Sequence, residues 1–439
     1  MGNELNTEEA LMNDRTKAPA IPEKWTARFF TVWAGQAVSL AGSSLVQFAL
    51  IWWMTRTTGS ATVLATATLI GMLPQIFLAP FAGALIDRWN RKKVMIVADS
   101  LIALATLALI FLFAAGRESV WAVYTILFIR SAGGAFHFPA MQASTSLMVP
   151  KEQLARIAGL NQTLSGVVNI VSPPLGALLV VLLPMQGVLA IDVATAIIAV
   201  SILAAIAIPQ PPRQIAQENG EIKKSSYWHD LRAGWTYMVS WPGLLGMALL
   251  AMVINFLLTP AGALMPLMVT KVFHKGALEL GWVDAAFGAG IIAGGLVLSA
   301  WGGFKKRIVT SLAGAIGIGV GILFFGLLPV NLFYLSLASI FLFGSMIAMA
   351  NGPLNAIFQS SIDPDMQGRV LSLIGAGATA MSPLSLLVAG PVSDWLGIRT
   401  WFLVGGGACI VMAVAGFFIP AIMNIENNKK ESVIAPGVG

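Results

Sequence analysis

The sequence predicts an all-α polytopic membrane protein with twelve transmembrane helices in two pseudo-symmetric six-helix bundles. Its 439 residues are 57% hydrophobic and 10% charged, whereas a soluble domain is about half apolar and about a quarter charged. Apolar runs of about 20 residues, enough to cross a bilayer as a helix, recur along the chain. Motifs near residues 83, 149 and 171 are repeated near 295, 362 and 381, which indicates two related halves.

The apolar runs are continuous, unlike the short alternating segments of a transmembrane β-barrel. The expected spans are 29–54, 62–86, 94–114, 119–148, 157–183, 187–208, 243–271, 280–300, 308–329, 331–360, 369–393 and 398–422. The polar first 28 residues have no apolar core of a cleavable signal peptide, so the first span is expected to act as an uncleaved signal. The only cysteine, Cys409, lies in the last span, which excludes an intrachain disulfide.

The repeat divides the chain into five parts. We expect a cytoplasmic N-terminal segment (1–28), an N-terminal six-helix bundle (29–208), a cytoplasmic linker (209–241), a C-terminal six-helix bundle (242–422) and a cytoplasmic tail (423–439). Two parallel halves related by an axis along the membrane normal are a known transporter plan.

The linker contains one segment with helical periodicity. In "SYWHDLRAGWTYMV", Trp228, Leu231, Trp235 and Met238 recur at helical spacing. This pattern predicts an amphipathic helix, either on the inner membrane surface or as a cytosolic surface helix.

The distribution of basic residues predicts the orientation. With a cytoplasmic N-terminus, the cytoplasmic segments carry twenty of the 26 Lys and Arg residues, the outer loops carry five, and Arg130 lies within a span. This asymmetry follows the positive-inside rule. The net charge of +6 therefore reflects topology rather than nucleic-acid binding, and we expect a multi-pass protein of the cell membrane with both termini cytoplasmic.

The turn "GALIDRWNRKKV" (83–94) concentrates charge in this apolar chain. It resembles the signature of the major facilitator superfamily, roughly Gly-x-x-x-Asp-Arg-x-Gly-Arg-Lys, through Gly83, Asp87, Arg88, Arg91 and Lys92. The sequence departs from the signature at Asn90, where the family has glycine; asparagine also tolerates left-handed turns.

Two further elements strengthen this resemblance. Arg130-Ser-Ala-Gly-Gly134 is similar to the family's Arg-x-x-x-Gly element, and Ser172-Pro173-Pro174-Leu175-Gly176 is similar to part of its antiporter element, Gly-Pro-x-x-Gly. Gly134, Pro173, Pro174 and Gly176 are therefore the expected helix-packing motif. The resemblance implies the major facilitator fold for the whole chain.

The stretches "WAGQAVSLAGSSLVQFALIWWMT", "FIRSAGGAFHFPA", "VPKEQLARIAG" and "GRVLSLIG" resemble the macrolide-efflux branch of this superfamily's drug exporters. The branch implies a proton-coupled exporter of macrolide-like or other amphipathic drugs. An exporter of a siderophore or another metabolite, a uniporter or importer, and a non-transporting receptor stay open. A receptor would be expected to carry a cytoplasmic signalling domain.

The resemblance implies a cytoplasmic latch between the two halves. Its candidates are Gly83, Asp87, Arg88 and Arg91, with Asp99 one turn into the next span. The aspartate would be stabilised by the arginines or by the N-terminus of a helix from the other half. The alternative is that these charges only set topology.

Charged residues within the spans are candidates for proton coupling, because intramembrane charges face the bundle interior or a watery cavity and are usually functional. Arg130 and His137 are seven residues apart on one helix face, and we interpret them as a pair in which the arginine lowers the proton affinity of the histidine. Asp192 and Asp284 occupy similar places in the two halves. Either aspartate could instead lie at the interface as a helix cap.

The resemblance implies that spans 1, 4, 7 and 10 line the substrate cavity. Polar and methionine side chains on these spans suit an amphipathic ligand, and most could alternatively pack in the core or face lipid. The candidates are Gln36, Ser39, Ser43, Met252, Asn255, Thr259, Met349, Asn351 and Asn355.

Several activities have no sequence signature. The chain has no P-loop and no Cys/His cluster. We therefore expect no enzyme activity, no metal site and no cofactor, with transport driven by the proton gradient. The expected partners are an amphipathic small molecule, protons and the lipid bilayer, with no nucleic acid. A monomer is expected, and a companion ATPase-like protein stays open.

Overall fold

The computed structural model describes residues 25–86, 89–210 and 227–426, and within these ranges the regular elements are all helical. Twelve of the described helices have 21 residues or more. They are α2 (Trp25–Thr58), α3 (Ala61–Ile86), α4 (Arg91–Ala114), α5 (Val120–Met148), α6 (Leu154–Leu182), α7 (Met185–Ala205), α9 (Pro242–Leu267), α10 (Ala277–Trp301), α11 (Arg307–Leu327), α12 (Phe333–Ser361), α13 (Pro364–Leu396) and α14 (Ile398–Phe418).

These helices coincide with the twelve predicted spans, with ends that differ by a few residues. The ends follow local sequence signals. The Asn90 side chain accepts a hydrogen bond from the Lys93 backbone N–H (3.1 Å) and caps α4, and Ser119 caps α5 through the Ala122 N–H (3.2 Å). Asn90 is extended (φ −70°) rather than left-handed, because an N-cap residue adopts the β region.

Eleven of the described helical segments are both long and apolar enough to cross a membrane. The twelfth long helix, α5, is less apolar because it carries Arg130, His137 and many small or polar residues. Polar groups in a spanning helix have to face protein or water rather than lipid. The composition of α5 therefore marks it as a helix that packs inside a bundle.

The helices form two compact units. Among the described residues, unit 1 contains 25–46, 70–86, 89–168 and 183–210, and unit 2 contains 47–69, 169–182 and 227–426. The two units are not identical with the two sequence halves, because unit 2 includes the end of α2, the start of α3 and the end of α6 as well as the later helices. The predicted boundaries of the six-helix bundles stay a prediction.

Unit 1 has an apolar core at one end of its helices. Phe29, Ala82, Met95, Met148 and Leu203, which belong to α2, α3, α4, α5 and α7, are each at most 4% exposed and pack together. Close packing of these side chains against one another holds this end of the helices together.

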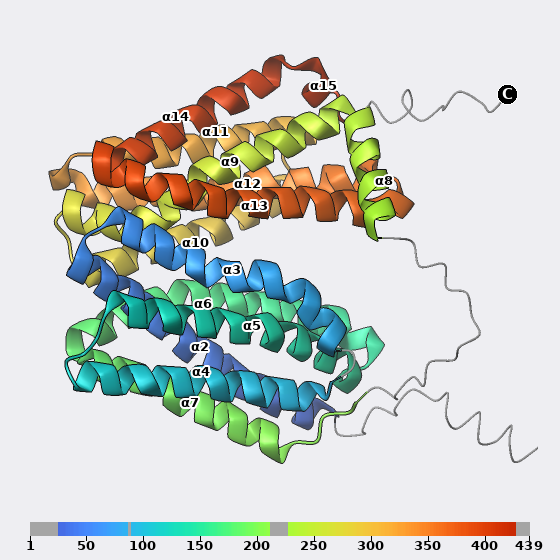
Figure 1. Cartoon of the computed structure of the whole chain (residues 1–439). Coiled ribbons are helices and arrows are strands. Elements are labelled where there is room, and N and C mark those ends of the chain that lie inside the picture. Colours follow the sequence, from blue (N-terminus) through green and yellow to red (C-terminus); the bar gives the residue numbers. More distant parts are fainter. Residues whose placement is uncertain (1–24, 87–88, 211–226, 427–439) are drawn as a thin grey trace, which may run out of the picture. The chain divides into compact units, whose positions relative to one another are not determined.

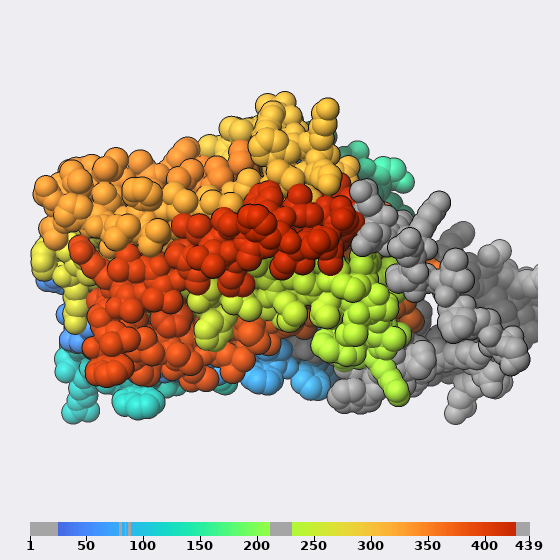
Figure 2. All heavy atoms as spheres, turned by 90° about the horizontal axis from the view of Figure 1, so that it is seen from above, coloured from blue at the N-terminus to red at the C-terminus, as the bar shows by residue number. Residues whose placement is uncertain are grey.

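Glycines set the helix packing in unit 2. A Cβ atom at Gly290 or Gly294 of α10 would meet the backbone oxygens of Phe341 and Ser345 in α12. The backbones of α10 and α12 therefore touch, as small residues allow in membrane helices. In the space-filling view, α14 (red) runs along one face of unit 2 beside α13 (orange-red), and α8 (lime, Tyr227–Ser240) lies at one end (Figure 2).

The helix predicted in the linker is α8, which crosses the end of α13 (Figure 1). Met238 is buried in the core of unit 2, whereas Trp235, predicted on the same apolar face, is 53% exposed. The Tyr237 hydroxyl donates to Asp363 Oδ2 (3.3 Å). The pKa of Tyr237 is raised above its ordinary value, chiefly by burial, so the hydroxyl stays protonated and keeps this bond.

Candidate functional site

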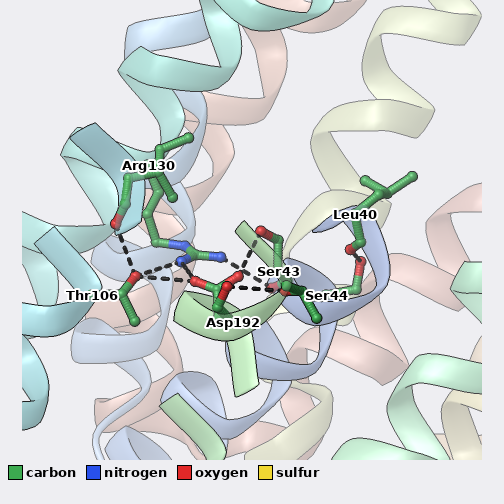
Figure 3. A network of polar contacts seen from close by, with 8 residues as sticks. Leu40, Ser43, Ser44, Thr106, Arg130 and Asp192 are labelled. Atoms are coloured by element: carbon green, nitrogen blue, oxygen red, sulfur yellow. Dashed lines mark hydrogen bonds and ion pairs between the residues drawn. The ribbon is translucent and has the colours of Figure 1, made fainter. Parts of the chain in front are cut away.

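A buried ion pair lies in the middle of unit 1. Arg130 Nη1 of α5 lies 2.5 Å from Asp192 Oδ2 of α7, and the two side chains are 9% and 1% exposed (Figure 3). A charge in such a place is costly unless it is paired and hydrogen-bonded. The pair makes both charges tolerable in the interior.

Two neighbouring helices complete this ion pair, which we call the Arg130–Asp192 network. Ser43 of α2 donates its hydroxyl to Asp192 Oδ1 (2.9 Å), and its carbonyl accepts from Arg130 Nη2 (3.2 Å). Thr106 of α4 accepts from Arg130 Nη1 (2.9 Å) and lies 3.1 Å from Asp192 Oδ2. Figure 3 shows these side chains converging from α2, α4, α5 and α7.

A second carboxylate of unit 1 is paired with the histidine. His137 Nε2 of α5 lies 3.4 Å from Asp99 Oδ1 of α4. Gln36 Nε2 of α2 donates to Asp99 Oδ2 (3.2 Å). Asp99 is 7% exposed, so its carboxylate is largely withdrawn from solvent.

The sequence paired Arg130 with His137, and the structure places each beside a different carboxylate. The two residues share a face of α5, but the face spans two neighbours, α4 and α7, which supply Asp99 and Asp192. A partner on another helix approaches more closely than a residue two turns away on the same helix. Helix periodicity therefore located both residues correctly but not their partners.

Only some residues of the expected cytoplasmic latch lie within the described part of the chain. Asp87 and Arg88 lie outside the described residues, and Gly83 lies near the end of α3, with open space where a Cβ would project. Arg91 is buried and donates from Nη1 to the Ala143 carbonyl of α5 (2.7 Å). Asp99, expected as a latch member, instead contacts His137 and Gln36.

The predicted packing motif on α5 is shifted by one residue. A Cβ at Gly134 would meet only Gln75 Nε2 at 3.7 Å, whereas a Cβ at Gly133 would lie 2.8 Å from Ile102 of α4. Ser131 donates to the Gly71 carbonyl of α3 (2.6 Å). Gly133 and Ser131 therefore hold α5 against α4 and α3 and position Arg130. The Gly-Gly pair at 133–134 was the signal that could have indicated Gly133.

The other packing residues and Asp284 belong to unit 2. Pro173 and Pro174 lie within α6, opposite Gly281 of α10, where a Cβ would lie 3.0 Å from Pro174 Cα. Gly176 faces Phe48 at 3.1 Å. Asp284 lies one turn along α10 from Gly281, and among the described residues it has no hydrogen-bond or ion-pair partner.

The cavity candidates separate into two groups. Gln36 and Ser43 are engaged with Asp99 and Asp192, as described above. Thr259 lies 3.1 Å from the Ser382 hydroxyl, and the Asn255 side chain donates to the Ala251 carbonyl in its own helix. Five candidates have no polar contact among the described residues: Ser39, Met252, Met349, Asn351 and Asn355.

Met349 is half-buried on α12. Among residues 25–86, 89–210 and 227–426, no group of three or more His, Cys, Asp and Glu side chains could hold a metal ion.

Comparison with known proteins finds relatives that are named as efflux proteins. The chain is 35% identical to macrolide efflux protein A of Streptococcus pyogenes over 402 residues, which cover 92% of this chain and 98% of that protein. It is 27% identical over 407 residues to the multidrug efflux pump Tap of Mycolicibacterium fortuitum, covering 88% of this chain and 94% of that pump.

The fold is also that of solved transporters. The structure superimposes on a variant of the nucleoside transporter NupG with a TM-score of 0.67 at 14% identity, covering 88% of this chain and 98% of that one. The sequence matches the Major Facilitator Superfamily over residues 32–385. The chain belongs to the Major Facilitator Superfamily.

Proposed function

We propose that this protein is a secondary active exporter that moves macrolide-like or other amphipathic drugs out of the cell by proton-coupled alternating access. The observation that carries the proposal is the 35% identity to a macrolide efflux protein over 92% of the chain. Similarity over this length supports a shared substrate class. The chain would work without a cofactor, driven by the proton gradient.

The proposed location is the cell membrane, with both termini cytoplasmic. The excess of basic residues in the segments assigned to the cytoplasm supports this orientation. The protein is proposed to act as a monomer, and a companion ATPase-like protein stays open.

The Asp99–His137 pair is the proposed proton-binding site. Arg130 balances the charge of Asp192, whereas His137 balances that of Asp99 only when the histidine is protonated. A single proton shared between Asp99 and His137 makes this site neutral as well, which lowers its cost in a low-dielectric interior. Loading and release of one proton therefore change the charge of the site between −1 and 0.

The link between proton and drug is proposed to run through α2. Gln36 and Ser43, two turns apart on α2, bind Asp99 and Asp192 respectively. Both were predicted to face the substrate cavity, so a drug that contacts Gln36 competes with its hydrogen bond to Asp99. Losing that bond destabilises the charged carboxylate and favours proton uptake, which provides the differential interaction that coupled transport needs.

A broader substrate range is the second candidate. The similarity to a multidrug efflux pump, at 27% identity over 88% of this chain, favours it. Met252 and Met349 on the predicted cavity helices suit several ligands, because methionine adapts its shape. Export of another amphipathic compound such as a siderophore belongs to this candidate.

Transport by the purified full-length protein in liposomes tests the proposal. A labelled macrolide is placed outside, the lumen is made acidic, and its accumulation is followed with and without a protonophore. We expect accumulation that the protonophore abolishes. Uptake that equilibrates without exceeding the external concentration would indicate a uniporter.

Empty liposomes and liposomes without a pH gradient are the controls. If the folded protein moves no macrolide but accumulates another amphipathic compound, the broader substrate range is supported and the macrolide class is rejected. Failure with every compound in both gradient directions would overturn transport and favour a receptor.

A further inference from the structure

The last turn of α13 is bound to the first turn of α3. The carboxylate of Asp394 accepts three hydrogen bonds, from the Ser60 hydroxyl (2.9 Å), the Ala61 backbone N–H (2.8 Å) and the Thr62 backbone N–H (3.0 Å). All of these residues belong to unit 2. We call this contact the Asp394 clasp.

The clasp satisfies groups that a helix cannot satisfy by itself. The first backbone N–H groups of an α-helix have no partner within the helix, and they form the positive end of its dipole. An aspartate that caps them normally precedes its own helix. In α3 the Val63 N–H is bonded to Ser60 Oγ (3.3 Å), and the N–H groups of Ala61 and Thr62 depend on an aspartate from a helix more than 300 residues later.

Close packing brings the two helices into this contact. Gly390 lies one turn before Asp394 on the same face of α13, and a Cβ there would lie 2.8 Å from Thr62 Cα and 3.2 Å from Ala65 Cβ. Ala61 and Ala65 are at most 2% exposed. The backbones of α3 and α13 therefore meet without intervening side chains.

A second pair of helices has the same kind of contact. A Cβ at Gly281 of α10 would lie 3.2 Å from the Pro173 carbonyl oxygen of α6, and one at Gly288 would lie 2.5 Å from Ile170. By the sequence repeat, α3 and α6 belong to the first half and α10 and α13 to the second. Two helices of each half thus close against each other through glycines, and the clasp is the polar contact among them.

The clasp is built to be reversible. The Asp394 side chain is exposed, so water can replace it at the N–H groups of α3 and can hydrate the released carboxylate. The exchange leaves no buried group unpaired, unlike rupture of the Arg130–Asp192 pair. Hydrogen bonds that exchange with water contribute modestly and suit a contact that opens in every cycle.

We infer that Asp394 is a gating residue that closes the outer end of the transport pathway by capping α3. This inference rests on the proposed function, because alternating access requires the two halves to separate on the side that releases substrate. Opening toward the outside breaks the clasp, and closing restores it. The spacing Gly390-x-x-x-Asp394 repeats that of Gly83-x-x-x-Asp87, which is the sequence signal for the residue.

Cysteine labelling tests the clasp without any substrate. In a Cys409→Ser background, which removes the only native thiol, Ala65→Cys places a thiol in the closed contact. A membrane-impermeant maleimide is added from outside in the intact cell. We expect Asp394→Ala to speed labelling about fivefold, as loss of an N-cap would, with a smaller increase for Asp394→Asn, which keeps one acceptor.

The matched control is Asp365→Asn, which removes an exposed aspartate from the other end of α13. It should leave the labelling rate unchanged, and Ala61→Cys should report the same order of variants as a second probe. Equal labelling of Asp394→Ala and its parent at both probes would overturn the inference, as would an equal increase in Asp365→Asn. Absence of drug transport by the parent protein would instead count against the proposed function.

Discussion

The two carboxylates inside unit 1 differ in how their charge is balanced. Asp192 forms an ion pair with Arg130, and its carboxylate accepts hydrogen bonds from the Ser43 and Thr106 hydroxyls. Asp99 has an amide donor and a histidine, which is charged only when it is protonated. The two sites therefore have different proposed roles, one structural and one in proton coupling, and mutation can separate them.

Asp192→Ala leaves Arg130 charged and without its carboxylate in a site where it is 9% exposed. Removing one partner of a buried pair costs about 3–5 kcal/mol, whereas replacing both by apolar groups can be nearly neutral. We expect a clear drop in the thermal unfolding temperature in detergent for the single variant and partial recovery in Arg130→Met/Asp192→Ala. A double variant no more stable than Asp192→Ala would contradict a direct pair.

Asp99→Asn removes the charge that a proton would neutralise and keeps an oxygen that can accept from Gln36. We expect the variant to exchange drug down its own gradient and to lose accumulation driven by a pH gradient, and His137→Gln to behave likewise. Both activities are measured in liposomes. Thr31→Ala, on the same helix as Gln36, is the control and should keep both activities, because the Thr31 hydroxyl donates to the Ala27 carbonyl of its own helix. Accumulation driven by a pH gradient at the parent level in Asp99→Asn would refute the assignment.

At the scale of the elements, helix position depends on small residues. In unit 1, Gly133 and Ser131 set α5 against α4 and α3. In unit 2, α10 and α12 touch through Gly290 and Gly294. Lipid is as apolar as a leucine side chain, so close packing rather than burial from water holds such helices together.

Two adjacent glycines of α10 provide a direct test of this packing. A Cβ at Gly294 would meet the Ser345 backbone, whereas a Cβ at Gly295 would have no neighbour within 4 Å. We expect Gly294→Ala to destabilise the protein by about 1–3 kcal/mol through overpacking, and Gly295→Ala to be neutral or stabilising by up to about 1 kcal/mol. Thermal unfolding in detergent measures both, and the opposite order would show that α10 and α12 do not pack as described.

At the scale of the whole molecule, the asymmetric distribution of basic residues predicts the orientation. The described helices reproduce the twelve predicted spans. Successive loops are therefore expected on opposite sides of the membrane. The loops assigned to the outside include Arg117 and Arg399, and those assigned to the cytoplasm include Lys305 and Lys306.

Reporter fusions check this orientation. An alkaline phosphatase fused after Arg117 or Arg399 is expected to be active, because it folds only outside the cytoplasm, whereas one fused after Lys306 should be inactive. A fluorescent protein at the C-terminus should show the reverse preference and fluoresce. Activity after Lys306 together with inactivity after Arg117 would invert the proposed topology.

The sequence by itself determined the fold class, the twelve long helices, the linker helix and the polar residues of the spans. These follow from apolar run length, helical periodicity and charge distribution, which are local properties of the chain. Tertiary structure alone decided that Arg130 pairs with Asp192, that His137 pairs with Asp99, and that Asp394 caps α3. A partner's identity depends on which helices are neighbours and at what rotation, and periodicity within one helix does not contain that information.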